Sequence, residues 1–359
     1  YDYLVLATGA THSYFGHEEW ASLAPGLKTL EDAVEIRRRV LLAFELAERQ
    51  QLEHGSYPPL NFVIVGGGPT GVELAGAISD ISRIYMRQEF RHIDPARARV
   101  IVMEGSPRVL GTYPEDLSRK AEEQLAHLGV EVRTNTHVTD IQPGYVVANG
   151  ERVKSVVTIW AAGVQASPLG NMLHAEVDKR GSIIVDQYLN PAGHPEIFVC
   201  GDLAHVVENG RQIPGVAQPA MQMGKHAGKE ILADLAGKPR TEFHYFDKGD
   251  MSTIGRHAAV ARVVWPFHAH LSGFPAWVTW LTVHIYFLVG FRNRVLVMLQ
   301  WMWMYFGFSG GPRLITGSQK LPGWAILSGQ PSEAREHSAA GEQQLDANSP
   351  GVVETVTAQ

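Results

Sequence analysis

The chain has 359 residues, of which 45% are hydrophobic and 19% charged, and its formal net charge is −6 at pH 7. This length predicts two or three domains with an ample buried core. The composition excludes collagen, disulfide scaffolds and simple coiled coils, and the negative charge argues against a nucleic-acid-binding surface. Cys200 is the sole cysteine, which excludes an internal disulfide, a redox cysteine pair and a zinc cluster, so the sequence indicates no metal site.

The first residues predict a strand that leads into a glycine turn. Residues 1–6 alternate polar and apolar side chains, and Thr8 and Gly9 follow. The sequence lacks an initial Met and begins inside this pattern, so we expect an N-terminally truncated part of a longer protein. The run Thr29-Leu30-Glu31-Asp32 has the form of a capping box and predicts a helix of about five turns.

A strand, crossover helix and strand are predicted between residues 60 and 104. The first strand covers residues 61–65, a helix continues from Val72, and a second buried strand covers residues 98–103. Residues 87–97 are interpreted as a surface loop inserted before the second strand.

The turn after the first strand carries Gly66, Gly68 and Gly71 with the spacing Gly-x-Gly-x-x-Gly, which in this context predicts a dinucleotide site. Gly66 permits the tight turn, Gly68 lets a pyrophosphate approach the backbone, and Gly71 lets helix and strand pack closely. Glu104, which ends the second strand, is expected to accept hydrogen bonds from the adenine ribose and to favour NADH over NADPH. Arg108, a few residues later, leaves NADPH as an alternative cofactor. The alternative interpretation of the turn is an ordinary glycine turn without a ligand.

The rest of the chain continues to alternate strands and helices, which predicts an α/β fold with parallel sheets covered on both faces. Further elements are expected at residues 116–128 (helix), 131–133, 156–160, 183–185 and 197–199 (strands) and 219–235 (helix). Two strands end in similar turns, Ala7-Thr8-Gly9 and Ala161-Ala162-Gly163, as expected for one domain nested inside another.

Two apolar stretches stand near the C-terminus. Residues 271–291 and 295–312 contain no Asp, Glu, Lys or Arg, and Arg292-Asn293-Arg294 separates them. The first stretch is long enough to cross a membrane, but Pro275 and several polar residues interrupt it and tryptophans crowd the region. This pattern predicts two helices that lie in one leaflet. A buried dimer interface is the alternative, because large apolar patches mark either kind of contact.

Five motifs match one known family. They are Ala7-Thr8-Gly9, the glycine-rich run at 66–76, residues 104–110, residues 198–202, and Ala217-Gln218-Pro219-Ala220-Met221-Gln222. Over residues 1–317 the chain resembles the type II NADH dehydrogenases, which are single-subunit, non-proton-pumping NADH:quinone oxidoreductases of the two-dinucleotide-binding-domain flavoprotein superfamily. The last motif resembles the quinone-site signature of this family.

The resemblance implies two nested Rossmann-like dinucleotide-binding domains, FAD and NADH as cofactors, and a C-terminal membrane-associating helical region. It divides the chain into residues 1–58 (first part of the FAD-binding domain with a linker helix), 59–168 (NAD-binding domain), 169–240 (second part of the FAD-binding domain), 241–327 (membrane-anchoring region) and 328–359 (disordered tail). It implies that the cofactors are held by Thr8, Gly9, Gly66, Gly68, Gly71, Glu104, Ala162, Gly163, Gly201, Asp202, Ala217 and Gln218.

Chemistry agrees with these assignments. Asp202 ends a strand, where its carboxylate can accept hydrogen bonds from the ribityl hydroxyls of FAD, and Gly201 allows close approach. Gln218 and Gln222 stand four apart near a helix start, so both amides can face one quinone, whose negative charge on reduction is favoured at a helix N-terminus. The alternative is that one glutamine caps the helix and the other is solvated. For Glu73 the family implies a role in relaying protons to the quinone. The alternative is that Glu73 is an acid without a catalytic role, attracted to the positive end of the helix.

The implied activity is hydride transfer from NADH to FAD and transfer of two electrons to a membrane quinone without proton pumping. The implied enzyme belongs to a respiratory chain, is peripheral on the cytoplasmic face of the inner (plasma) membrane, and is a possible homodimer. The family's glycine-rich turn for the FAD pyrophosphate has no equivalent here, so we ascribe flavin binding to the full-length protein. The alternatives are an NADH-dependent reductase of a small electron-carrier protein and a non-catalytic NADH/FAD-binding redox sensor.

Overall fold

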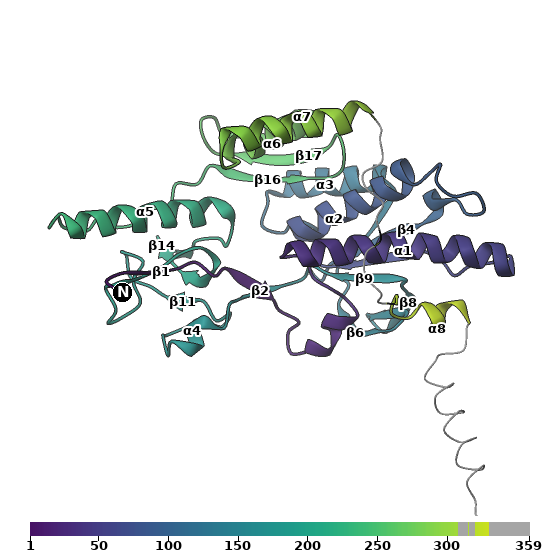
Figure 1. Cartoon of the computed structure of the whole chain (residues 1–359), viewed down its shortest axis with the longest axis horizontal. Coiled ribbons are helices and arrows are strands. Elements are labelled where there is room, and N and C mark those ends of the chain that lie inside the picture. Colours follow the sequence, from purple (N-terminus) through teal and green to yellow (C-terminus); the bar gives the residue numbers. More distant parts are fainter. Residues whose placement is uncertain (308–314, 316–319, 330–359) are drawn as a thin grey trace, which may run out of the picture.

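A parallel sheet of four strands, in the order β5-β4-β3-β9, forms the centre of the molecule (Figure 1). The computed structural model describes residues 1–307, 315 and 320–329. The strands are β3 (Asn61–Val65), β4 (Arg99–Met103), β5 (Val130–Arg133) and β9 (Val157–Trp160). Every residue of β3 and β9 is buried, as expected for strands covered on both faces. The four corresponding strand predictions are confirmed.

Different layers cover the two faces of this sheet. Side chains alternate along β3, so Phe62 and Ile64 face one layer and Val63 and Val65 face the other. The first layer consists of α1 (Leu30–His54), α2 (Pro69–Asp80) and α3 (Glu115–His127). The second is an antiparallel sheet of β6 (Val138–Gln142), β7 (Tyr145–Ala148) and β8 (Glu151–Lys154). The α/β class is confirmed.

Helix α1 begins at the predicted capping box. The Thr29 side chain accepts from the backbone N–H of Asp32, and the Asp32 carboxylate accepts from the backbone N–H of Thr29. The helix ends at Gly55, whose φ of 69° is the left-handed conformation that glycine adopts without strain. Its 25 residues make roughly seven turns, so the helix is longer than the five turns predicted, although it ends at the expected glycine.

Glu35 joins two buried arginines on α1. Its carboxylate accepts hydrogen bonds from Arg38 Nε at 2.7 Å and Arg39 Nε at 2.6 Å. Hydrogen bonding to Arg38, opposed by partial burial and assisted by Arg39, lowers the pKa of Glu35 to about 2. Because this pKa is depressed in the folded state, the stabilisation is complete above the ordinary glutamate pKa and is lost as the pH falls from there towards 2.

A Glu35→Gln variant is therefore expected to be less stable than wild type at pH 7 by about 2 kcal/mol. The difference should shrink as the pH is lowered through the window from about 4.5 to about 2. Urea denaturation at a series of pH values measures it, with Glu122→Gln on the exposed face of α3 as the control. A difference that stays constant across this window would contradict the assignment.

A second lobe is built around β1 (Leu4–Leu6) and β12 (Ile197–Val199), which pair in parallel with Leu6 opposite Val199. Helix α5 (Ala217–Leu235) packs its Met223 and Ala227 side chains into the core of this lobe. The chain leaves the lobe at β2 (Ala10–His12) and returns at β10 (Val164–Ala166), and these two strands pair antiparallel. The central sheet is thus inserted between two parts of one lobe, as the nested arrangement predicts.

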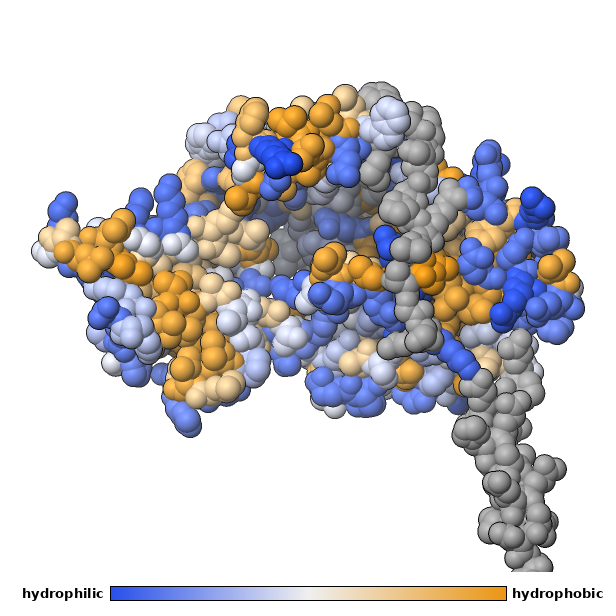
Figure 2. Space-filling view, in the orientation of Figure 1, coloured by the Kyte–Doolittle hydropathy of each residue, from blue (hydrophilic) through white to orange (hydrophobic). Residues whose placement is uncertain are grey.

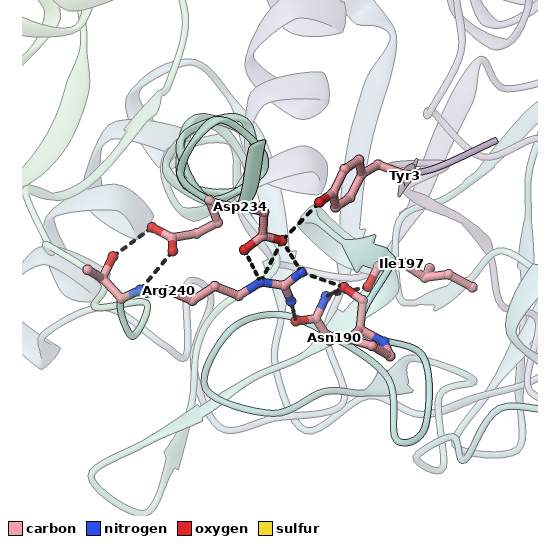
Figure 3. Close-up of polar contacts among 8 residues, drawn as sticks. Tyr3, Asn190, Ile197, Asp234 and Arg240 are labelled. Carbon is pink, nitrogen blue, oxygen red and sulfur yellow. Dashed lines mark hydrogen bonds and ion pairs between the residues drawn. The ribbon is translucent and has the colours of Figure 1, made fainter. Parts of the chain in front are cut away.

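Arg240 connects the end of α5 to the strands of this lobe through hydrogen bonds (Figure 3). Its guanidinium donates to both carboxylate oxygens of Asp234, to Asn190 Oδ1 at 2.7 Å and to the carbonyl of Pro195 at 2.8 Å. Asn190 Nδ2 in turn donates to the Ile197 carbonyl at 2.6 Å. Tyr3 beside β1 donates its hydroxyl to Asp234. These bonds join the N-terminal segment at Tyr3 to residues 190–240.

A third region follows the second lobe. It contains an antiparallel sheet of β16 (Gly249–Thr253), β17 (Ala259–Val263) and β18 (Ala269–Ser272), then α6 (Phe274–Phe287) and α7 (Phe291–Gly307). Figure 1 shows α6 and α7 side by side above β16 and β17. Ala276 of α6 packs against Ala259 and Ala261 of β17. The prediction of two helices in the apolar stretches is confirmed.

The outer side of α6 and α7 is strongly apolar (Figure 2). The exposed large hydrophobic side chains of these two helices include Tyr286, Phe291, Leu299 and Trp303. Within the described residues, neither of these helices nor any other reaches the length and hydropathy that a membrane crossing requires.

The remaining elements are short. They are η1 (Glu18–Ser22), the π-helical η2 (Ile81–Tyr85), η3 (Pro95–Arg97), α4 (Leu169–Met172), β11 (Ile183–Ile184), η4 (Gly201–Leu203), β13 (Ala204–His205), β14 (Val207–Glu208), β15 (Arg211–Gln212) and α8 (Trp324–Ser328). Of the predicted disordered tail, residues 330–359 lie outside the described part of the chain.

Candidate active site

The glycine-rich turn between β3 and α2 has the geometry that a dinucleotide requires. Gly66 has a φ of 109°, and a Cβ there would lie 2.6 Å from the backbone of Ala161. A Cβ at Gly71 would lie 1.9 Å from the carbonyl oxygen of Gly66, so this glycine lets helix and strand close up. At Gly68, by contrast, a Cβ would meet no atom within 4 Å. The open space at Gly68 lies at the N-terminus of α2, where backbone N–H groups attract a phosphate.

Glu104 lies beside this turn, at the end of β4. Its carboxylate accepts from the backbone N–H of Gly67 at 2.6 Å and from that of Ser106 at 2.7 Å. Glu104 thus fixes the turn through one oxygen and the following loop through the other. A carboxylate has further acceptor positions on both oxygens, so these bonds leave capacity for ribose hydroxyls.

The predicted flavin residues gather at the carboxyl ends of β1 and β12. Because these strands are parallel neighbours, Thr8 and Gly9 lie at the same edge of the sheet as Gly201 and Asp202. Gly9 and Gly201 both have positive φ, of 67° and 71°. Asp202 pairs with Lys28 Nζ at 3.0 Å. Both glycines and the carboxylate fit the ribityl part of a flavin nucleotide, where backbone must come close to the ligand.

Ala162 and Gly163 lie after β9, between the two lobes. Gly66 packs against the backbone of Ala162, and a Cβ at Gly163 would lie 2.6 Å from the ring of Phe15. The carbonyl of Gly163 accepts from the backbone N–H of Ser13. These two residues therefore connect the glycine-rich turn with the segment that follows β2.

The glutamine pair near the start of α5 forms hydrogen bonds with the backbone of residues 246–249. Gln218 Nε2 donates to the Gly249 carbonyl at 2.7 Å, and Gln218 Oε1 accepts from Lys248 N at 3.3 Å. Gln222 makes the same two kinds of bond with the backbone of Phe246. Ala217 begins the helix. Both amides thus join α5 to the segment that enters β16, a partner that their spacing did not reveal.

Glu73 bonds to the other end of β16. Its carboxylate accepts from the Ser252 hydroxyl and from the backbone N–H of Thr253, both at 3.3 Å. Burial raises the pKa of Glu73, and these two hydrogen bonds oppose the shift. Since β16 spans about 13 Å from Gly249 to Thr253, one strand connects the glutamine pair to Glu73.

Glu73 lies in the wall of a cavity of about 650 Å³ between α2 and the third region. One wall comes from α2, η2 and the turn after β16, and the opposite wall comes from α6 and α7. The side chains of that opposite wall are apolar or aromatic, and they include Phe274, Trp277, Trp280, Leu281, Ile285, Met298, Trp301, Met302 and Tyr305. Trp280 and Trp301 stack with ring centroids 5.8 Å apart. A flat, apolar molecule fits such a lining.

Sequence analysis did not single out Asp80 or Lys28. Asp80 lies in the same cavity wall as Glu73. The sequence could have indicated it, because Asp80 follows Glu73 by seven residues, which is close to two turns of one helix. Lys28 gave no signal, because its contact with Asp202 joins residues 174 apart. Cys200 lies buried beside Gly201, and burial raises the pKa of its thiol to about 11, as expected for an unreactive cysteine.

The comparisons with known proteins agree with this geometry. Residues 1–224 match the family model described as pyridine nucleotide-disulphide oxidoreductase. Among solved structures, NDH2 from Plasmodium falciparum in complex with NADH superposes with a TM-score of 0.75 at 19% identity, covering 88% of this chain and 79% of that one. This likeness shows the fold.

Two relatives from Mycobacterium tuberculosis are each 40% identical to this chain. The one named type II NADH:quinone oxidoreductase NdhA matches over 96% of this chain and 74% of its own length. The one named type II NADH:quinone oxidoreductase Ndh matches over 89% and 70%. The chain therefore belongs to the type II NADH:quinone oxidoreductases, within the pyridine nucleotide-disulphide oxidoreductase family.

Proposed function

We propose that this protein transfers two electrons from NADH to a membrane quinone without pumping protons. The observation that carries the proposal is the placement of two sites on one helix. The N-terminus of α2 presents the open space at Gly68, and one turn later Glu73 enters the wall of the aromatic cavity. A dinucleotide and a lipid-soluble acceptor are thereby brought to the same element.

The nucleotide is held at the glycine-rich turn. The pyrophosphate lies against Gly68 and the first amides of α2, and the ribose hydroxyls bind Glu104. Gly66 and Gly71 keep the turn tight, since neither accommodates a Cβ. The negative charge of Glu104 repels a 2′-phosphate and favours NADH.

The flavin lies at the edge formed by Thr8, Gly9, Gly201 and Asp202, with Ala162, Gly163 and the start of α5 at Ala217 around it. Bound FAD supplies the two-electron chemistry that connects NADH with the quinone. Asp202 holds the ribityl hydroxyls, and the N-terminus of α5 favours negative charge near it.

The quinone is bound by Gln218 and Gln222. Each amide uses one N–H on the backbone of residues 246–249, so each retains a second N–H that can donate to a quinone carbonyl. Glu73, held at the far end of β16, supplies a proton to the reduced quinone. The two backbone bonds fix the amides in place before the quinone arrives.

The exposed aromatic face of α6 and α7 docks on the membrane surface, and the cavity behind it admits the quinone from the lipid. The protein is peripheral on the cytoplasmic face of the inner membrane. A homodimer that formed through the same face would exclude membrane docking, because one apolar surface cannot make both contacts at once.

A Gln218→Leu variant tests the proposal in the FAD-loaded full-length protein. Stopped-flow absorbance follows bleaching of the flavin by NADH and its recovery on adding a soluble quinone. Leucine removes the remaining donor, so we expect recovery to slow by on the order of tenfold to a hundredfold while bleaching by NADH is unchanged. Gln88→Leu, on an exposed turn, is the matched control.

Equal loss of both half-reactions in Gln218→Leu would contradict the quinone assignment. If wild-type flavin is bleached quickly but never recovers with quinone, the protein instead reduces a small electron-carrier protein. If NADH binds without bleaching, the protein is a redox sensor.

A further inference from the structure

The aromatic cavity contains a second carboxylate besides Glu73. Asp80 is the last residue of α2, is only 7% exposed, and contributes to the same wall. The two acids are seven residues apart on one helix, so they lie on the same face about 10 Å apart. Two acids in a wall that faces tryptophans are unusual, because burial of an ionised carboxylate is costly.

The backbone changes where Asp80 lies. Residues 81–85 form a single π-helical turn, η2, and π turns inside helices occur frequently at functional sites. The wider turn follows Asp80 directly and places Ile81 and Tyr85 in the cavity wall.

The hydrogen bond that Asp80 accepts does not require an acid, although the nearby charge of Arg256 favours the ionised carboxylate. Asp80 accepts this bond from the backbone N–H of Arg256, which opposes the effect of burial, and the net result is that burial raises the pKa of Asp80 to about 6. A neutral asparagine could accept the same N–H bond without the desolvation cost. A titratable carboxyl group buried in a cavity wall is a candidate for proton transfer.

The proposed reaction needs a proton that NADH does not bring. A hydride carries two electrons and one proton, whereas a quinone needs two electrons and two protons to become a quinol. The balance is NADH + H⁺ + quinone → NAD⁺ + quinol. One proton must therefore come from water, through a cavity whose opposite wall is apolar.

We propose that Asp80 is a relay residue for this proton, taking it from water in the cavity and passing it through further water to Glu73, which delivers it to the reduced quinone. This inference rests on the proposed function. The cavity is large enough for it, because its volume of about 650 Å³ far exceeds the roughly 30 Å³ that one water occupies. Asp80 acts through Glu73 and is a positioning residue, not a catalytic one.

Other ionisable groups lie in or next to the cavity wall that contains Asp80. They are Glu73 on α2, Tyr85 in η2, Arg256 and His257 in the turn between β16 and β17, and Tyr305 on α7. Arg256 favours the charged form of Asp80, and burial favours the neutral form. Burial also lowers the pKa of His257, so above neutral pH His257 adds no charge that could replace the one lost in an Asp80→Asn variant.

The test compares Asp80→Asn, Asp80→Glu and the control Asp94→Asn in the FAD-loaded full-length protein with saturating NADH and quinone. Asp94 is an exposed acid that caps a short turn, a role asparagine also fills. We expect Asp80→Asn to lower kcat by on the order of tenfold with an unchanged KM for quinone. Wild-type kcat should fall as the pH rises above about 6, and Asp80→Asn should lose this dependence. Asp80→Glu should restore both.

A second readout needs no turnover. The dimethyl ether of an isoprenyl hydroquinone, which cannot be reduced, should quench the tryptophan fluorescence of the cavity equally in wild type and Asp80→Asn. Absence of quenching in wild type would overturn the cavity assignment of the proposed function. Quenching in both proteins, combined with an Asp80→Asn variant that keeps the wild-type kcat and pH profile, would overturn the role of Asp80. A lowered kcat with an unchanged pH profile and no rescue by glutamate would also overturn it, in favour of a structural role.

Discussion

A Gly68→Val variant is expected to fold as wild type does and to lose NADH binding. Gly68 has φ −70° and ψ −178°, an extended conformation open to any residue, and a Cβ there meets no atom within 4 Å. The valine side chain therefore costs the fold little, yet it occupies the space where the pyrophosphate approaches the backbone. We expect the Kd for NADH to rise about a hundredfold, which corresponds to about 2.7 kcal/mol.

Isothermal titration with NADH measures this effect. Gly228→Val is the matched control, because Gly228 lies in α5 and a Cβ there also meets open space. Gly71→Ala separates binding from packing, since its Cβ would lie 1.9 Å from the Gly66 carbonyl oxygen and should destabilise the fold itself. An NADH affinity within threefold of wild type in Gly68→Val would show that the nucleotide does not bind at this turn.

Arg240→Ala is expected to destabilise the protein by about 3 kcal/mol. The substitution removes donors to Asp234, Asn190 and the Pro195 carbonyl (Figure 3). It leaves the Asp234 carboxylate, whose side chain is 20% exposed, with only the Tyr3 hydroxyl as a side-chain partner in the network of Figure 3. The guanidinium also covers the ring of Phe198 with its carbon 4.9 Å from the ring centroid, so apolar contact is lost as well.

Urea denaturation followed by circular dichroism measures the loss. Arg211→Ala, on the exposed strand β15, is the control and should be nearly neutral. Arg240→Lys retains the charge but not the planar fork and should fall between the two. A change below about 1 kcal/mol for Arg240→Ala would mean that the network is dispensable for stability.

The central sheet and its helices were predictable because their signals are local. Residues 62–65 are uniformly apolar and run into a glycine pattern, and Thr29 and Asp32 form a cap within four residues. The short strands β2 and β10 were not predicted, since each has three residues and depends on a partner about 150 positions away.

The candidate site divides in the same way. Gly66, Gly68, Gly71 and Glu104 follow one another within one strand, helix and strand unit, so their spacing in this context predicts the nucleotide site. The backbone partners of Gln218 lie about 30 residues later, and no spacing encodes them. Asp80 was missed because an acid in a helix is ordinarily solvated, whereas here the turn between β16 and β17, about 175 residues later, packs against it through Gly255 and Arg256.

The stacked tryptophans behind α6 and α7 also determine how the enzyme behaves once it is purified. A detergent with a slender alkyl chain matches the lining of the 650 Å³ cavity as well as an isoprenoid tail does, and it is present in millimolar excess over any assay quinone. We expect such a detergent to compete with quinone for this cavity, so the apparent affinity for quinone should change with the detergent concentration. Bulky steroid-like surfactants, or nanodiscs, leave the cavity free and report the affinity of the protein itself.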